Sequence, residues 1–216
     1  MIISEQKPIE EILKALSQYK NIFIFGCGDC ATTCKSGGED EVNKISAILK
    51  ENKKNATGKA IIDTGCDERL AKKCINEHLK EIKKSDAVLV LSCGAGTQTL
   101  TYILEIPVFT GTNSLFIAKI NNLRLFSQKC ETCGDCLLNI YGGICPITQC
   151  AKSILNGPCG GAKDGKCEVD PEVDCAWGLI FERLKKLNKL KDIKKIRLPR
   201  DYSKSHKPKY KKIDTK

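Results

Sequence analysis

The sequence has little of what most catalytic sites use, and it contains only two histidines, His78 and His206. Neither falls into a Ser/His/Asp, Cys/His or paired-carboxylate arrangement, so we expect no bond-making chemistry by this chain alone. No apolar run reaches the roughly 18 residues that a membrane span needs. The first residues also lack the apolar region and cleavage site of a signal peptide, so we expect a cytoplasmic protein.

Cysteine, by contrast, is abundant, with 14 in 216 residues. Thiols stay reduced in the cytoplasm, so these cysteines predict metal ligands more than disulfides. Eight of them lie close together, at Cys130, Cys133, Cys136, Cys145, Cys150, Cys159, Cys167 and Cys175. Glycines, acids and short polar turns separate them, with too few apolar residues for a core. This segment is therefore expected to fold around a bound group.

The spacing of these cysteines favours iron–sulfur clusters. Cys130, Cys133 and Cys136 form a C-x2-C-x2-C run, which can bind three corners of one cubic cluster. Cys145 precedes a proline, as in bacterial ferredoxins, but at a longer spacing than theirs. Eight thiolates match two 4Fe–4S clusters, which we predict. Zinc is the alternative, although its structural sites usually come as paired C-x2-4-C halves, and only one such run is present.

Four short blocks in this segment also carry a family resemblance. They are N-G-P-C-G-G at 156–161, D-G-K-C-E-V-D-P at 164–171, C-A-W at 175–177 and I-F-E-R-L at 180–184. Together they resemble the small cysteine-rich accessory subunit of anaerobic methylenetetrahydrofolate reductases, the methylenetetrahydrofolate reductase C-terminal domain family. The resemblance covers roughly residues 115–187 and continues more weakly through the N-terminal half.

The resemblance implies an iron–sulfur electron carrier that feeds the flavin of a catalytic partner. That flavin would reduce a methylene group on a folate- or pterin-type carrier to a methyl group. The electron donor would be ferredoxin or an electron-bifurcating assembly. Zinc has also been associated with the family, so a zinc-binding structural scaffold of such a complex is the alternative. A free-standing ferredoxin-like carrier is a third interpretation.

The N-terminal half predicts a different architecture, in which strands alternate with helices. Apolar runs favour strands at 21–25, 59–63, 87–92 and 106–110, and helical spacing favours helices at 8–19, 40–53, 67–85 and 96–104. Such alternation indicates a parallel sheet covered on both faces. We predict a small doubly wound α/β domain over residues 1–114.

Five of the remaining six cysteines come just after predicted strands: Cys27, Cys30, Cys34, Cys66 and Cys93. Open α/β sheets bind ligands at the carboxyl edge of their strands, so we predict a third metal site there. The expected cluster is held by Cys27, Cys30, Cys34 and one of Cys66 or Cys93. The sixth cysteine, Cys74, lies inside a predicted helix and is expected to be a core thiol.

The remaining segments complete a three-part organisation. A linker-like helix is predicted over 115–129, at the start of a ferredoxin-like, cysteine-rich domain spanning 115–187. A helix over 178–190 would close that domain, with Trp177, Leu179, Ile180 and Leu184 on its apolar side. Residues 188–216 are expected to form a flexible tail. Nearly all net basicity lies there, since residues 185–216 carry 14 Lys/Arg and 3 Asp/Glu. No nucleic-acid fold accompanies it, so a tether to an acidic partner face is favoured over RNA binding.

Overall fold

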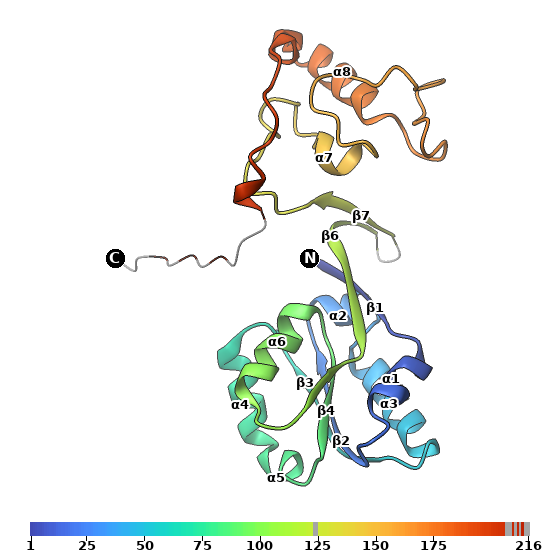
Figure 1. The fold of residues 1–216 in the computed structure, drawn as a ribbon, viewed down its shortest axis with the longest axis vertical. Helices are drawn as coiled ribbons and strands as arrows, with labels where there is room; N and C mark the ends of the chain where they lie inside the picture. Colours follow the sequence, from blue (N-terminus) through green and yellow to red (C-terminus); the bar gives the residue numbers. More distant parts are fainter. Residues whose placement is uncertain (123–124, 206–208, 210, 212, 214–216) are drawn as a thin grey trace. The chain divides into compact units, whose positions relative to one another are not determined.

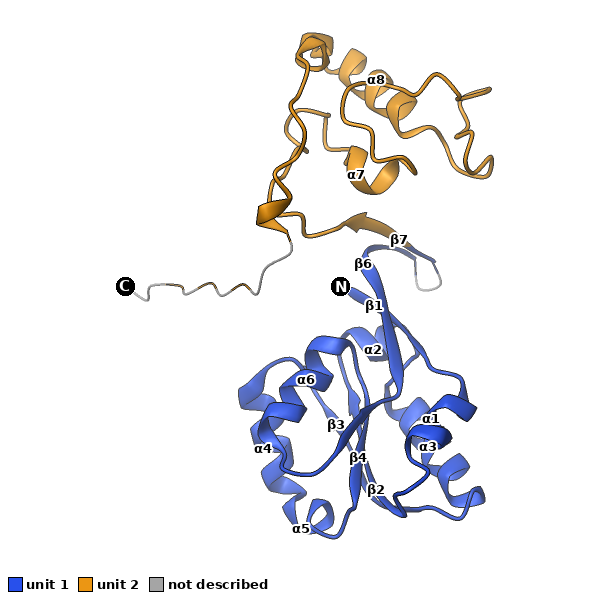
Figure 2. Cartoon of the chain, viewed as in Figure 1, with its two compact units in different colours: residues 1–126 blue, residues 127–216 orange. Residues whose placement is uncertain are grey.

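The computed structural model describes residues 1–122 and 125–205, together with residues 209, 211 and 213. The chain divides into two compact units, Met1–Phe126 and Ser127–Lys216 (Figure 2). His206 and most of the end of the basic tail lie outside the described residues. Within the described part, no helix has the length and apolar character needed to cross a membrane.

The first unit is built on four parallel strands in the order β3-β2-β4-β5 (Figure 1). These are β2 (Asn21–Cys27), β3 (Asn55–Ile62), β4 (Ala87–Leu91) and β5 (Val108–Thr110). Helices connect successive strands, as right-handed parallel crossovers require. The predicted parallel α/β architecture is confirmed.

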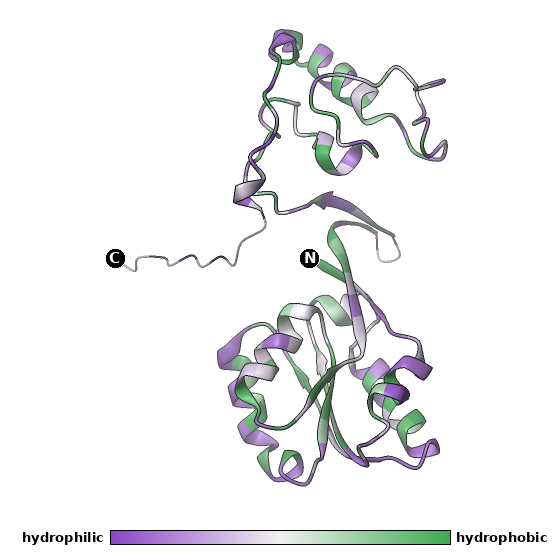
Figure 3. Ribbon diagram, viewed as in Figure 1, coloured by the Kyte–Doolittle hydropathy of each residue, from purple (hydrophilic) through white to green (hydrophobic). Residues whose placement is uncertain are grey.

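Both faces of the sheet are buried, because alternate side chains of each central strand enter different cores. Ile22 and Ile24 pack under α1 (Ile9–Ala15) and α3 (Glu39–Glu51). Phe23 and Phe25 pack on the other face, against α4 (Glu68–Glu77), α5 (Leu79–Ile82) and α6 (Gly94–Ile103). Each such fully buried side chain stabilises the fold by about 1.5–3 kcal/mol. Figure 3 shows the apolar strands between helices with polar outer faces.

A second sheet corrects one prediction. The helix expected over 115–129 is wrong, because this stretch forms β6 (Thr112–Asn122) and β7 (Leu125–Cys130). β6 pairs antiparallel with β1 (Ile2–Gln6), and the sheet order is β1-β6-β7. The apolar residues of 115–120 also fit helical spacing, but pairing with a distant strand decided the outcome. Leu123, part of the predicted helix, lies outside the described residues.

Gly37 fixes how the chain leaves the sheet after β2. Its carbonyl accepts a hydrogen bond from the backbone N–H of Cys27 at 2.9 Å. A Cβ at this position would lie 1.9 Å from the carbonyl oxygen of Leu91. Because that obstacle is backbone in the central strand β4, a side-chain rotation cannot relieve it.

Gly37→Ala should therefore destabilise the first unit by about 3 kcal/mol or slightly more, the upper range for overpacking. The midpoint of denaturant unfolding measures this loss. Gly94→Ala is the matched control, because a Cβ there would meet only Ser114 Oγ, at 3.7 Å. If both variants unfold at the wild-type midpoint, the close approach of Gly37 to β4 is not present in solution.

The second unit has a small core and long irregular loops. Its described helices include α7 (Pro146–Gln149) and α8 (Ala176–Lys186), so α8 begins and ends earlier than predicted. The fully buried core consists of Tyr141, Trp177, Ile180 and Leu184. The Tyr141 and Trp177 rings meet edge to face, with centroids 5.4 Å apart. Leu179, expected on the apolar side of α8, is 45% exposed instead.

Residues 190–205 differ from the expected flexible tail. They contain two turns of 3₁₀ helix, η1 (Leu190–Lys194) and η2 (Tyr202–Lys204). Asn156 bonds the backbone of Arg197 twice, accepting from its N–H at 2.7 Å and donating to its carbonyl at 2.9 Å. The Arg197 guanidinium also lies 5.7 Å from the centroid of the Tyr141 ring. These contacts attach the segment to the second unit, where sequence composition alone predicted a solvated chain.

Candidate metal centres

Four cysteines of the second unit line one pocket: Cys130, Cys133, Cys136 and Cys145. Cys130 ends β7, and the loop after it turns through left-handed conformations at Thr132 (φ 52°) and Gly134 (φ 78°). This turning brings the three cysteines of the C-x2-C-x2-C run around a common space. Cys145 joins them as the residue that precedes α7, where Pro146 occupies the first helical position.

The other four cysteines line a second pocket: Cys150, Cys159, Cys167 and Cys175. Cys150 follows the last residue of α7, and Cys175 precedes the first residue of α8. Trp177, which also lines this pocket, donates from Nε1 to the Ile154 carbonyl at 2.9 Å. The pocket therefore rests on the small core of the unit.

The eight cysteines thus divide four and four, a partition that sequence spacing left open. The dividing element is α7, since Cys145 lies before it and Cys150 after it. The sequence carried a signal for this division. Cys145 is followed by Pro146, and a second cysteine, Cys150, lies five residues after Cys145. A proline that starts a single helical turn places the two flanking cysteines at opposite ends of that turn.

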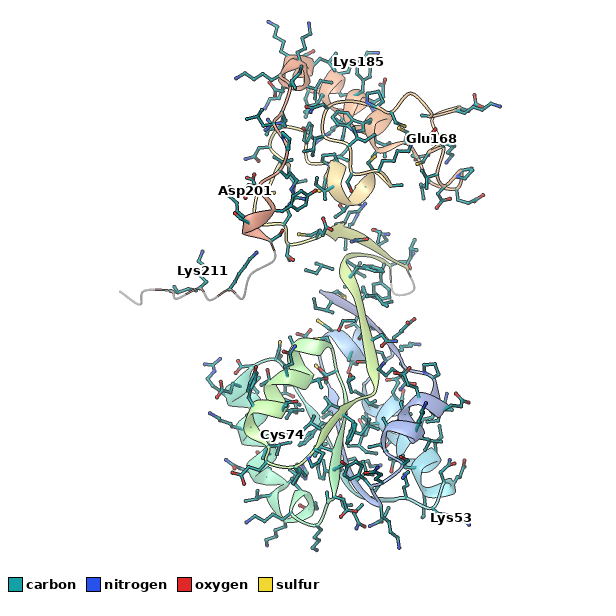
Figure 4. The ribbon with its side chains drawn as sticks, in the orientation of Figure 1. Lys53, Cys74, Glu168, Lys185, Asp201 and Lys211 are labelled. Carbon is teal, nitrogen blue, oxygen red and sulfur yellow. The ribbon has the colours of Figure 1, made fainter. Side chains whose placement is uncertain are left out.

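A charged pair lies at the second pocket. Glu168, labelled in Figure 4, forms an ion pair with Lys152 and accepts a hydrogen bond from the Cys159 thiol at 3.3 Å. The hydrogen bond from Lys152, followed by the one from Cys159, lowers the pKa of Glu168. The hydrogen bond to Glu168 in turn raises the pKa of Lys152. A metal bound by Cys159 as thiolate would displace the proton that this cysteine donates to Glu168.

Arg200 lies at the loop of the first pocket. Its side chain is only 6% exposed, and its Nη2 donates to the Cys133 carbonyl at 3.4 Å. Its Nη1 lies 3.9 Å from a carboxylate oxygen of Glu131, and its guanidinium is 5.1 Å from the centroid of the Tyr202 ring. The segment before η2 therefore places a nearly buried positive charge beside the C-x2-C-x2-C run.

The first unit brings further cysteines together at the carboxyl edge of its parallel sheet. Cys27 ends β2, while Cys66 and Cys93 follow the neighbouring strands β3 and β4. Cys30 begins the short helix α2 (Cys30–Thr33) directly after β2. The Cys27 sulfur accepts a hydrogen bond from the backbone N–H of Gly65 at 3.4 Å, which joins the loops after β2 and β3.

The thiols at this edge influence one another electrostatically. Burial raises the pKa of Cys30, and the charges of Asp29, Cys93 and Cys27 raise it further, against a lowering hydrogen bond from Ile2. Burial also raises the pKa of Cys66, followed by the charges of Cys93, Cys27 and Cys30. Without a cation at this edge, these two thiols are therefore held in their protonated form more firmly than free cysteine.

Cys34 and Cys74 are placed differently. The Cys34 sulfur lies 3.7 Å from the Ile2 carbonyl oxygen, as donor to β1. Cys74 lies on α4 (Figure 4), is 9% exposed and packs in the core against the sheet. The prediction that Cys74 lies in the core is confirmed.

All three groups consist of sulfur donors, which suit iron–sulfur clusters and zinc more than hard cations. In the described part of the chain, no set of three or more Cys, His, Asp or Glu side chains closes around a single metal ion. A four-iron cube separates its thiolates more widely than one ion does.

Part of the chain matches a known family. Residues 109–203 match the family model described as "Methylene-tetrahydrofolate reductase C terminal", from the end of β5 through η2. No curated protein matches the chain. Two crystal structures of arylmalonate decarboxylase, one of them the Gly74Cys mutant with sulfate, align at 18% identity and a TM-score of 0.33. The alignments cover 48% of this chain and 45% and 46% of the decarboxylase chains, and they carry no conclusion about function.

Proposed function

Because residues 109–203 match the methylene-tetrahydrofolate reductase C-terminal family model, we propose that the chain is an iron–sulfur electron-transfer subunit. It would deliver electrons to the flavin of a methylenetetrahydrofolate reductase catalytic partner. The observation that carries this proposal is the division of eight cysteines into two pockets of four, the ligand count of two 4Fe–4S clusters. The electron donor would be ferredoxin or an electron-bifurcating assembly.

The chain's own residues would perform three tasks in this role. The thiolates of each pocket would hold one cluster, which supplies one-electron redox chemistry when bound. Loops with little regular structure would wrap it and offer backbone N–H groups to sulfur, as Thr132 does to the Cys130 sulfur at 3.3 Å. Exposed ligands would leave each centre near the surface, since Cys130, Cys136 and Cys159 are exposed. A cluster near the surface can exchange electrons with a docked protein.

Anaerobic purification of the complex from its native source tests this function directly. Iron, acid-labile sulfide, zinc and flavin are measured in the intact complex, and the reduced chain is then mixed with its oxidised flavoprotein partner. We expect iron and sulfide in equal amounts, little zinc, and reduction of the partner's flavin. Stoichiometric zinc without sulfide would instead establish the structural scaffold. Iron–sulfur protein without a co-purifying flavoprotein would favour the free-standing carrier.

Arg200 provides a test specific to the first pocket. A positive charge near a cluster stabilises its reduced, more negative form. Arg200→Gln should therefore lower the reduction potential of the cluster at Cys130–Cys145 by roughly tens of millivolts, the scale of one partly screened charge. Redox titration monitored by EPR measures the shift.

Arg200→Lys is the matched variant, because it keeps the charge but loses the planar guanidinium that reaches the Cys133 carbonyl. Its potential should stay close to that of the wild type. If Arg200→Gln and Arg200→Lys shift the potential equally, the hydrogen bond or packing is responsible rather than the charge. If neither shifts it, Arg200 does not act on the cluster.

A further inference from the structure

The carboxyl edge of the parallel sheet in the first unit carries four thiols that the two C-terminal pockets do not use. We propose that Cys27, Cys30, Cys66 and Cys93 form a third centre, which binds a 4Fe–4S cluster independently of those pockets. This assignment concerns only the first unit. It would stand or fall separately from the electron-transfer function proposed above.

The topology of the sheet is the first support. Strands β3, β2 and β4 are neighbours, with Cys27 in register with Ile62 and Gly26 in register with Leu91. The three strands therefore end side by side, and each supplies a cysteine at its last residue or within four residues after it. Cys30 adds a fourth thiol from α2. Four thiols that span 67 residues of the sequence, from Cys27 to Cys93, thus gather at one edge.

An unpartnered buried hydroxyl is the second, independent support. Ser92 is 2% exposed, and its Oγ has no hydrogen-bond partner. A Cβ on Gly65 would lie 3.2 Å from this oxygen and 3.6 Å from the Cys27 sulfur, so the hydroxyl and the thiol border the same space. A buried hydroxyl without a partner carries a free-energy cost, because it has lost its hydrogen bonds to water. The sulfide or thiolate of a cluster would accept its proton and remove that cost.

Two glycines keep this space open. A Cβ at Gly96 would lie 2.2 Å from Ser92 Oγ, and one at Gly65 would lie 3.2 Å from the same oxygen. Side chains are therefore excluded on both sides of the hydroxyl. Cys93 is also the N-cap of α6, so it lies at the start of that helix.

The same geometry revises the ligand set that spacing predicted. Cys27 ends β2, and Cys66 and Cys93 follow the neighbouring strands β3 and β4, so these three segments meet at the same edge. Cys34 instead directs its sulfur to the Ile2 carbonyl of β1. The structure therefore favours both Cys66 and Cys93 as ligands, with Cys34 as a neighbour outside the set.

The test uses the full chain, reconstituted with ferrous iron and sulfide without oxygen and compared with Cys66→Ala, Cys93→Ala, Cys34→Ala and Cys74→Ala. Cys66 is exposed, so its replacement should leave the fold intact. We expect Cys66→Ala and Cys93→Ala each to lose about one third of the bound iron and sulfide, one cluster of three. Cys34→Ala and Cys74→Ala should retain all of it. Circular dichroism verifies folding in each variant.

Each alternative outcome is distinct. Full iron content in both Cys66→Ala and Cys93→Ala would overturn the third centre, and loss of one zinc ion instead of iron would overturn its identity as a cluster. Loss of iron in Cys34→Ala would overturn the proposed ligand set. A different result would contradict the electron-transfer function: cysteine variants in the C-terminal pockets would leave the iron content unchanged.

Discussion

Cys133→Ser should remove one of the two clusters proposed for the second unit and loosen the fold around it. The core of this unit consists of four fully buried side chains, Tyr141, Trp177, Ile180 and Leu184. Ordering the backbone of each residue costs about 1–2 kcal/mol of conformational entropy. A core of this size therefore cannot hold the long loops by burial alone. Cluster binding would supply the missing free energy, as metal binding does in other small metal-dependent domains. Iron analysis and thermal unfolding of the second unit measure both effects.

The four-and-four partition makes this prediction sharper. Cys133→Ser should spare the cluster at Cys150–Cys175, and Cys167→Ser should spare the cluster at Cys130–Cys145, each variant keeping one set of cluster signals. Cys74→Ser is the control, because Cys74 lies in the core of the first unit and outside every proposed centre. Unchanged iron content and unchanged melting in Cys133→Ser would contradict the cluster assignment. Loss of both clusters in each single variant would indicate that the two pockets fold as one unit.

Trp177→Ala should destabilise the second unit by about 3–5 kcal/mol, the usual cost of truncating a buried tryptophan. Trp177 is 4% exposed, packs edge to face on Tyr141 and donates a hydrogen bond to the Ile154 carbonyl. It also lines the pocket of Cys150, Cys159, Cys167 and Cys175. The variant should therefore bind the second cluster poorly. Denaturant unfolding followed by far-UV circular dichroism measures the stability.

Two variants separate the contributions. Trp177→Phe keeps an aromatic ring, so it should destabilise the second unit less than the alanine variant does. It still leaves the Ile154 carbonyl without its hydrogen-bond donor. Leu179→Ala on the same helix should change stability by no more than about 0.5 kcal/mol, because Leu179 is 45% exposed. A loss in Leu179→Ala comparable to that in Trp177→Ala would mean that α8 buries a different face.

The local pattern of apolar residues was sufficient to predict an element wherever that element buries its own apolar side chains in the core. Uninterrupted apolar runs predicted β2 and β4, because strands buried on both faces need no polar side. Helical spacing predicted α3, whose buried residues are Val42, Ile45 and Leu49. The pattern failed at residues 112–130, where pairing with β1 supplies the backbone hydrogen bonds of β6. Such pairing joins residues more than a hundred positions apart and leaves no mark in local spacing.

The sequence by itself determined that this chain carries two kinds of segment and that thiols are its principal chemistry. Spacing showed eight cysteines without a core of their own and five at the ends of strands, because ligand runs and strand ends are local features. Only the tertiary structure decided which thiols share a pocket. It separated the eight across α7 and brought Arg200 to the Cys133 loop. Those outcomes depend on contacts between segments 15 to 67 residues apart, which form only when the chain folds.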